Sequence, residues 1–399
     1  MVEFENMSHR YSKLFSRSWK LINSTLAGES LSDPFTITSY NILADSLVQK
    51  NEYLYNHIES DQLQWKKRSK VLLKELQERN SDIYCLQEVD QIHYERDFLP
   101  FFKQRDFYGS YKQRTGGELK DGCAIFVNHR RFKIIKEQLL EYHQGHLLDR
   151  NNVAIIIILQ DRKDPSCKLC VANTHILFNP KRGLHKVAQL DLLFNCIRDL
   201  MHSDENISLV LCGDFNTLPY TSIFNYITKG NINLSTIEEE YMSGQVSPPR
   251  YLSRHNHRHQ YNRRSVGPYN SALIRELSRT RNSIFPQLFN RTTSQQHEHK
   301  HILTHDFDLR SVYFPFRRSD FTTYHQHARL TCDYIFYGNL KKHEEEFSDE
   351  KGERRPKLAL RERLALPAPH ELQHVPGFPW YGIPSDHLSI SARFQFVME

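Results

Sequence analysis

The chain has 399 residues, of which 39% are hydrophobic and 25% charged, a composition typical of a globular protein rather than a disordered or fibrous one. Its 53 Lys and Arg exceed its 47 Asp and Glu by six, so the chain is weakly basic. The longest apolar run, residues 153–159, is too short to span a bilayer, no signal-peptide pattern follows Met1, and the seven cysteines form no disulfide pattern. We expect a cytoplasmic protein, with a nuclear location as an alternative, and no association with membranes.

Residues 1–34 have no periodic apolar pattern, and we predict a flexible lead-in. Their basic residues also allow a mitochondrial presequence, but Glu3 and Glu5 argue against it. From residue 36 onward, eight apolar, β-branched runs predict strands: residues 36–43, 83–87, 123–127, 153–159, 169–173, 209–212, 332–337 and 388–396. Residues 65–76 and 187–201 have apolar positions at helical spacing. Together these patterns predict one layered α/β domain over residues 35–399.

Residues 245–318 hold 13 Lys and Arg against 4 Asp and Glu, a local charge of +9, so the remainder of the chain sums to −3. This composition predicts a basic, mobile insertion with at most one short helix, over residues 272–278. Two interpretations stay open for it, a solvated variable loop and a surface for nucleic-acid phosphates, because arginines and tyrosines alternate over residues 250–264. A second charged run, residues 341–357, predicts a solvated connection.

Polar side chains that can carry chemistry stand at the ends of the predicted strands. They are Asn41, Glu88, His175, Asp214, Asn216, Asp333, Asp386 and His387. Taken singly, each is more often a turn former or a loop cap than a catalyst. Taken together, they occupy positions at which a rigid sheet can bring groups to one cleft. Hard oxygen ligands of this kind suit Mg²⁺ or Mn²⁺ with substrate phosphate oxygens, which indicates phosphoester hydrolysis.

Six short motifs occur in order along the chain: SYNIL at 39–43, LQE at 86–88, NTH at 173–175, GDFN at 213–216, DYIF at 333–336 and SDH at 385–387. This series resembles the endonuclease/exonuclease/phosphatase superfamily, which includes deoxyribonuclease I and the poly(A) deadenylases. Further stretches, at 115–116, 121–125, 148–153, 171–175, 179–183, 243–245 and 332–337, look most like the Angel proteins. The resemblance implies a four-layer α/β/β/α sandwich, in which two packed mixed sheets are flanked by helices.

The same resemblance implies an activity. It is Mg²⁺-dependent, with Mn²⁺ as an alternative, and acts on RNA 3′ ends of tRNA or mRNA. For Angel-like proteins the implied reaction is hydrolysis of a 2′,3′-cyclic phosphate end to the free hydroxyls. The alternative is a 3′–5′ exoribonuclease that removes poly(A) from mRNA.

Residue roles follow from the resemblance, position by position. Glu88 resembles the principal metal ligand, with Asn41 and Asp386 as ligands of the metal or of its water. Asp214 would orient and deprotonate the attacking water with help from Asn216. Asp333 would hold the imidazole of His387 against the phosphate, and His175 would contact a phosphate oxygen. Whether Asp214 or His387 is the base stays open.

Substrate recognition is expected at Asn179, Pro180 and Ala328. In the resembling deadenylases a phenylalanine stands at the position of Ala328 and stacks on adenine, an interaction worth about 1–3 kcal/mol per base. Alanine cannot stack, so selectivity for adenine is not expected. The H-E-x-x-H pattern at 297–301 could indicate a zinc protease, but it lacks the apolar face of an amphipathic helix, and we interpret it as a chance match. The lone C-x-x-C at 167–170 has no second pair and no thioredoxin-like context, and we interpret it as two reduced thiols at the start of a strand.

Overall fold

The structure is a computed structural model that describes residues 17–22, 29–202, 204, 206–247, 279, 301–325, 328–341 and 355–398. The helix predicted over residues 272–278 lies outside the described residues, as do residues 297–300 of the H-E-x-x-H pattern and the arginine-rich stretch from 250 to 264. No helix within the described ranges is both long and apolar enough to cross a membrane.

The first sheet contains eight strands in the order β1-β17-β18-β3-β4-β6-β5, with β2 paired beside β18. Their bounds are Trp19–Leu21 (β1), Glu29–Ser30 (β2), Phe35–Asn41 (β3), Ile83–Asp90 (β4), Phe107–Gln113 (β5), Asp121–Asn128 (β6), Pro356–Leu364 (β17) and Ile390–Met398 (β18). Only β3 and β4 pair in parallel among these neighbours, so the sheet is mixed.

The second sheet contains six strands in the order β13-β16-β10-β9-β8-β7. Their bounds are Phe132–Glu141 (β7), Val153–Asp161 (β8), Lys168–His175 (β9), Ile207–Asp214 (β10), Phe307–Ser311 (β13) and Asp333–Leu340 (β16). Two small ribbons lie outside the sheets: β11 (Asn231–Asn233) with β12 (Ile302–Thr304), and β14 (Thr323–His325) with β15 (Ala328–Leu330).

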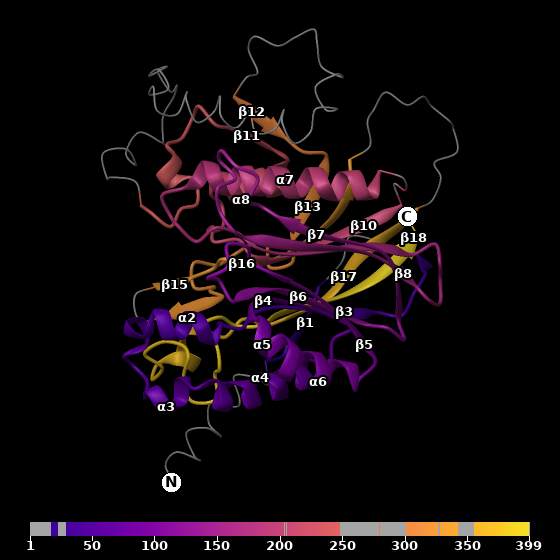
Figure 1. The fold of residues 1–399 in the computed structure, drawn as a ribbon. Coiled ribbons are helices and arrows are strands. Elements are labelled where there is room, and N and C mark those ends of the chain that lie inside the picture. Colours follow the sequence, from indigo (N-terminus) through magenta and orange to yellow (C-terminus); the bar gives the residue numbers. More distant parts are fainter. Residues whose placement is uncertain are drawn as a thin grey trace, which may run out of the picture.

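Helices cover the outer face of each sheet (Figure 1). Beside the first sheet lie α4 (Trp65–Arg79), α5 (Gln91–His93), a π-helical turn (Tyr94–Phe98) and α6 (Leu99–Lys103), and beside the second lie α7 (Gly183–Met201) and α8 (Ser222–Lys229). Shorter helices are α2 (Asp45–Lys50), α3 (Ser60–Leu63) and 3₁₀ turns at Glu52–Tyr55, Glu239–Tyr241 and Pro369–Leu372. The four-layer α/β/β/α sandwich implied by the resemblance is therefore confirmed.

Strand β8 shows why the sheets pack face to face. Its apolar run has no polar alternation, so both of its faces must be buried. Ile155 and Ile157 join the core between the two sheets, while Ile156 and Ile158 join the core under α7 and α8. A third core lies between the first sheet and α4, where Leu72 and Leu76 pack. One strand thus links two hydrophobic layers.

All eight predicted strands and both predicted helices are present, but the edges of the sheets differ from expectation. Within the predicted lead-in, β1 pairs with β17 and β2 pairs with β18. The predicted basic insertion extends too far, because β13 at its C-terminal end is an edge strand of the second sheet. The connection predicted over 341–357 overlaps the start of β17. These are short or charged strands whose local sequence is weak, and their partners come from distant parts of the chain.

Candidate functional site

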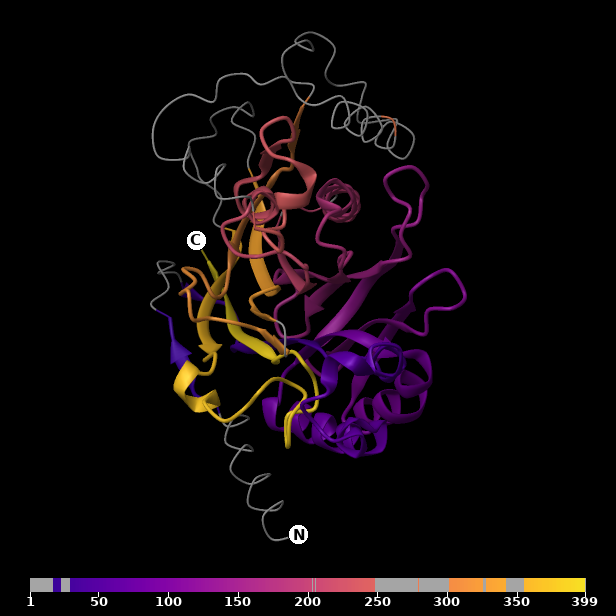
Figure 2. The ribbon, with the colours of Figure 1, turned by 90° about the vertical axis from the view of Figure 1, so that its left-hand side faces the viewer.

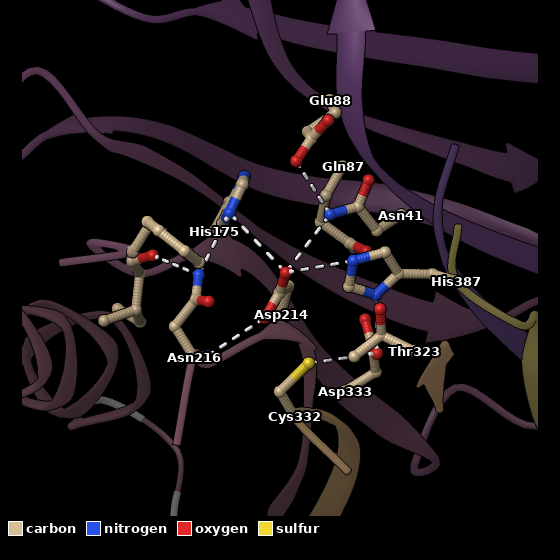
Figure 3. Close-up of polar contacts among 12 residues, drawn as sticks. Asn41, Gln87, Glu88, His175, Asp214, Asn216, Thr323, Cys332, Asp333 and His387 are labelled. Atoms are coloured by element: carbon tan, nitrogen blue, oxygen red, sulfur yellow. Dashed lines mark hydrogen bonds and ion pairs between the residues drawn. The ribbon is translucent and has the colours of Figure 1, made fainter. Parts of the chain in front are cut away.

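Most of the predicted catalytic residues meet at one end of the sandwich, where Asn41 of the first sheet contacts Asp214 of the second. Figure 3 shows this cluster. Parallel pairing of β9 with β10 places His175 beside Asp214, and antiparallel pairing of β10 with β16 places Asp333 on the other side of Asp214. The first sheet contributes Asn41 from the end of β3, together with the end of β4. This end of the sandwich faces the viewer in Figure 2, where the indigo, orange and yellow segments come together.

Asp214 lies at the centre of the cluster and is almost fully buried. Its Oδ1 accepts a hydrogen bond from the backbone N of Asn216 at 3.0 Å, and its Oδ2 accepts one from Asn41 Nδ2 at 3.1 Å. Burial and the carboxylate of Asp333 raise the pKa of Asp214, against the opposing effect of nearby histidines. A carboxylate that is buried yet oriented by two donors suits proton transfer.

Gly213 allows the close approach of strands that this arrangement needs. A Cβ at this position would lie 2.1 Å from the carbonyl oxygen of Thr174 on the neighbouring strand. Any side chain would therefore push β9 and β10 apart where His175 and Asp214 stand in register. This contact explains the glycine of the GDFN motif.

Glu88 owes its direction to an irregularity in β4. The register with β6 shifts between Leu86 and Val89, and Glu88 has a φ of 54°, which is rare for a residue other than glycine. The bulge brings the carboxylate to Asn41, whose Nδ2 donates to Oε1 at 3.0 Å. The backbone N of Ala44 donates to Oε2 at 3.2 Å. Strain of this kind persists where the surrounding contacts hold it, often at functional positions.

His387 and Asp333 form a directed pair. His387 Nδ1 lies 2.8 Å from Asp333 Oδ2, while its Nε2 faces Asp214 Oδ2 at 3.9 Å. Burial alone would lower the pKa of His387, but the carboxylates of Asp333 and Asp386 outweigh it and hold this pKa well above its usual value. The raised pKa favours the protonated ring, in which Nδ1–H donates to Asp333 and Nε2–H faces Asp214.

His175 has the opposite electrostatic character. Burial lowers the pKa of His175 to about 4, although the carboxylate of Asp214 raises it. Its Nε2 lies 3.6 Å from Asp214 Oδ2 and 3.3 Å from Asn216 Nδ2. Asn216, with a φ of 47°, also donates from Nδ2 to the carbonyl of Ile176 at 3.0 Å. The two imidazoles of the site thus have opposite pKa shifts.

Two carboxylates, Glu88 and Asp386, are able to hold a divalent metal. Asp386 Oδ2 accepts a hydrogen bond from the Tyr55 hydroxyl at 3.1 Å, but its Oδ1 is buried and has no hydrogen-bond partner among the described residues. Burial, followed by the negative charges of Asp386 and Asp121, raises the pKa of Glu88 to about 8. Carboxylates that repel each other out of water, with one oxygen unsatisfied, fit a hard cation.

A second group of potential ligand atoms, from Asp214, Cys332, Asp333 and His387, lies within 4.8 Å of one another. This group fits a metal less well than the Glu88 pair does. Asp333 and the His387 ring already bind each other, and burial raises the pKa of the Cys332 thiol well above its usual value, so it stays protonated. A protonated thiol is a poor ligand for Mg²⁺, which takes oxygen donors.

Buried cations that the sequence analysis missed hold the loops of the site. Lys186 on α7 is fully buried and donates from Nζ to the carbonyl of Asn216 at 2.6 Å and to that of Phe178 at 3.3 Å. It also donates to the side chain of Gln245. Burial lowers the pKa of Lys186 to about 7. The sequence signal for Lys186 is a charged residue at an apolar position of the helical pattern.

Arg68 on α4 plays a similar part beside the first sheet. This buried guanidinium donates from Nη1 to the carbonyls of Leu43 at 2.9 Å and Pro384 at 3.1 Å. It therefore joins the segment after Asn41 to the segment before Ser385. Ser385 in turn accepts from the backbone N of His387 at 3.1 Å and donates to the carbonyl of Asn41 at 2.7 Å.

The three residues predicted for substrate recognition lie on two separate elements. Asn179 is exposed, and its Oδ1 accepts from the backbone N of Lys181 at 3.0 Å, while the carbonyl of Pro180 accepts from Ser243 Oγ at 3.4 Å. Both belong to the loop after β9, which also carries Phe178. Ala328 lies on the ribbon of β14 and β15, which is joined to the site where Thr323 pairs with His387.

Comparison with known proteins agrees with this geometry. The pattern of the endonuclease/exonuclease/phosphatase family matches residues 38–387. Protein angel homolog 2 of Homo sapiens is 30% identical over 435 residues, covering 98% of this chain and 77% of that protein. A crystal structure of ANGEL2, described as a 2′,3′-cyclic phosphatase in complex with adenosine-2′,3′-vanadate, superposes with a TM-score of 0.72 at 30% identity, covering 95% of this chain and 98% of that one.

The catalytic domain of human nocturnin, with 20% identity and a TM-score of 0.55 over 96% of this chain and 99% of that one, shares the fold. The chain belongs to the endonuclease/exonuclease/phosphatase family, and within it to the Angel proteins. The predicted class of enzyme, a phosphoric ester hydrolase, is confirmed. The roles of the individual site residues remain predictions.

Proposed function

We propose that this protein hydrolyses 2′,3′-cyclic phosphates at RNA 3′ ends to leave free 2′ and 3′ hydroxyls. The observation that carries the proposal is the arrangement of Asp214 between the imidazoles of His175 and His387, with Asn41 joining it to the carboxylate of Glu88. Similarity to a 2′,3′-cyclic phosphatase over 95% of the chain supports the choice of bond. Two successive hydrolyses are required, the first opening the ring and the second releasing phosphate.

The chain's own groups suit each proton transfer. Asp214, fixed by Asn216 and Asn41, would accept a proton from the attacking water. His387, charged and held by Asp333, would place Nε2–H against a phosphate oxygen and supply a proton to the departing alkoxide. We assign Asp214 as the base, because the raised pKa of His387 favours its protonated form, in which neither ring nitrogen has a free lone pair.

His175 would make a further contact with the phosphate. Its neutral ring accepts from Asn216 at Nε2, which leaves the proton on Nδ1. Nδ1 is buried and has no hydrogen-bond partner within the described part of the chain. A neutral N–H donor stabilises a phosphate oxygen without adding a charge that competes with a cation.

Glu88 and Asp386 would hold Mg²⁺, with Mn²⁺ as an alternative, and Asn41 would orient the Glu88 carboxylate or a metal-bound water. When bound, the ion supplies a positive charge that stabilises the non-bridging phosphate oxygens. Asp121, buried near Glu88 and at 3.5 Å from Arg114, adds negative charge to the same end of the site. The excess of carboxylates explains why a divalent rather than a monovalent cation fits.

Recognition of the terminal base is proposed at Asn179, Pro180 and Ala328. Ala328 presents no ring, so a terminal adenine gains no stacking energy there, and an end-healing reaction on mixed RNA ends is favoured over removal of poly(A). The substrates proposed are 3′ ends of tRNA or mRNA. A cytoplasmic location, with a nuclear location as an alternative, is part of this proposal.

The test is incubation with Mg²⁺ of two labelled RNAs of equal length, one ending in a 2′,3′-cyclic phosphate and the other in a 3′-hydroxyl oligo(A) tail. We expect the cyclic phosphate to disappear while the RNA keeps its full length. Glu88→Gln protein serves as the control, because it keeps the shape of the side chain and removes its charge. A ladder of shortened tails would instead make the protein a 3′–5′ exoribonuclease.

A further inference from the structure

A patch of exposed aromatic and basic side chains lies beside the site without a part in the proposed chemistry. The aromatic members are Tyr220 and Phe314, which are 54% and 55% exposed, and the basic members are Arg317 and Arg318, which are also exposed. We call these four residues the rim patch. Exposed aromatic rings beside unpaired cations are the combination that single-stranded nucleic acids bind.

Strand order places the rim patch at the same end of the second sheet as the catalytic cluster. β10 and β13 both pair antiparallel with β16, so β10 and β13 run in the same direction. Asp214 ends β10, and Ser311 ends β13. The residues that follow each strand therefore emerge at one end, where Asp333 begins β16. Tyr220 follows Asn216 by four residues, which limits their separation to about 14 Å.

Tyr220 is held rigidly although it is exposed. Its hydroxyl accepts from the backbone N of Phe316 at 2.9 Å and donates to the carbonyl of the same residue at 3.2 Å. Its ring lies edge-on to Phe314, with 6.1 Å between ring centroids. Its φ is 64°, a conformation that is costly for an aromatic residue. A strained, locked and exposed ring gains little for the fold, which points to a ligand.

The charge of the patch is positive and available. Neither Arg317 nor Arg318 forms an ion pair within the described ranges. The nearest acid in the sequence, Asp320, uses its Oδ2 to accept from the backbone N of Arg317 at 2.9 Å. The ring of Phe316 beneath the patch packs edge-on against Tyr334, next to catalytic-cluster residue Asp333. The patch is thus anchored to the strand that carries the cluster.

We propose that the rim patch binds the RNA strand upstream of the terminal nucleotide, with a nucleobase stacked on Tyr220 or on Phe314 and phosphates at Arg317 and Arg318. This inference rests on the proposed function, because it assumes an RNA end in the site. Stacking depends on the flat face that every base has, so the patch selects single-stranded RNA of any sequence over a mononucleotide. It would therefore set the preference for polymer substrates.

The experiment compares two substrates in the full-length protein with Mg²⁺: adenosine 2′,3′-cyclic monophosphate and a ten-nucleotide RNA that ends in a cyclic phosphate. For Tyr220→Ala and Phe314→Ala we expect kcat/KM on the RNA to fall about tenfold. On the mononucleotide it should stay within twofold. For the double variant Arg317→Ala/Arg318→Ala, the slope of log KM for RNA against log salt should fall by about 1.4, the value for two phosphate contacts with a single strand.

Matched controls are available on the opposite edge of the same sheet. Lys133 and Lys136 on β7 are exposed, so Lys133→Ala/Lys136→Ala changes the net charge by the same amount far from β13. Leu139→Ala removes an exposed apolar side chain from that edge. Both control variants should leave kcat/KM on the two substrates unchanged. Thermal unfolding of every variant checks that the fold is kept.

The outcomes separate this inference from the proposed function. If wild-type protein hydrolyses the mononucleotide and the rim variants lose activity on both substrates equally, the patch supports the site but does not bind RNA, and the inference is overturned. If the rim variants keep full activity on RNA, the inference is likewise wrong. If wild-type protein hydrolyses neither cyclic phosphate, the proposed function itself fails.

Discussion

Asp214 and Asp386 differ in how many of their carboxylate oxygens accept hydrogen bonds from the protein. Both oxygens of Asp214 accept hydrogen bonds, from Asn216 and from Asn41. Asp386 instead keeps one buried oxygen without a hydrogen-bond partner in the described structure, and its charge contributes to the raised pKa of Glu88. Asp214 has its hydrogen bonds in the folded protein and suits proton transfer. That buried oxygen of Asp386, beside Glu88, would gain a partner from the proposed cation.

The largest effect on kcat is expected for a substitution of Asp214. Asp214→Asn should lower kcat by roughly 10³-fold, because it removes the proposed base and leaves its neighbours in place. The free energy of unfolding should stay the same or rise, since burial and Asp333 disfavour the charge of Asp214 in the folded state. Phosphate release and chemical denaturation measure the two quantities. A variant with activity within tenfold of wild type would show that another group is the base.

At the proposed metal ligands, Glu88→Gln should lower kcat by about 10²-fold or more. This is the scale of one charge interaction with a metal that stabilises the transition state. Addition of Mg²⁺ should raise the thermal unfolding temperature of the wild type and leave that of the variant unchanged. Differential scanning fluorimetry with and without EDTA tests this. An equal shift in both proteins would place the metal elsewhere.

The raised pKa of Glu88 predicts that the free energy of unfolding depends on pH when no metal is bound. The pKa of Glu88 is about 8 in the folded state against 4.5 as its ordinary value, so between these pH values the folded chain keeps a proton that the unfolded chain has lost. Stability in EDTA should therefore fall as the pH rises from about 4.5 to about 8. Glu88→Gln should flatten this slope. Thermal unfolding at several pH values measures it, and parallel slopes in both proteins would contradict the prediction.

Asp333→Asn tests the role of His387, the histidine that faces Asp214. The carboxylate of Asp333 is the main partner that outweighs burial and raises the pKa of His387. Without it the ring should lose its proton at a lower pH, and kcat should fall by about 10²-fold at neutral pH with a new loss of activity as the pH rises. Kinetics from pH 5 to 9 and NMR titration of the His387 ring follow this change. An unaltered pH profile would exclude the proposed role of the pair.

The smallest effect on activity is expected for Lys186, which forms no hydrogen bond with Asp214, Asp386 or Glu88 and instead donates to backbone carbonyls of the site loops. Lys186→Met keeps the length of the side chain but removes the hydrogen bonds to Asn216 and Phe178, and kcat/KM should fall by about tenfold. Lys168→Met is a matched control, because Lys168 pairs with Asp204 at the other end of β9. If both variants behave alike, Lys186 supports the fold and not the site loops.

Much of the site could be predicted because each of its residues lies at the end of a strand with a strong local pattern. The strands that end at Asn41, His175 and Asp214 are rich in β-branched and apolar residues and are buried almost throughout, so they can be predicted without knowledge of distant partners. Edge strands could not be found in this way. β17 contains three consecutive charged residues at positions 361–363, and β13 lies within a basic segment, so pairing with β18 and β16 rather than local preference decides their structure.

The sequence by itself determined the order of the motifs, the α/β class, the family and the identity of the charged residues at the strand ends. Tertiary structure alone decided that both oxygens of Asp214 accept hydrogen bonds while, among the described residues, one oxygen of Asp386 does not, that the pKa of His387 is raised while that of His175 is lowered, and that Lys186 and Arg68 hold the loops. The physical reason is that residue type and periodicity act over a few neighbours, whereas burial, charge and hydrogen bonding join segments that lie, for example, 25 residues (Arg68 to Leu43) or 173 residues (Asn41 to Asp214) apart in the chain.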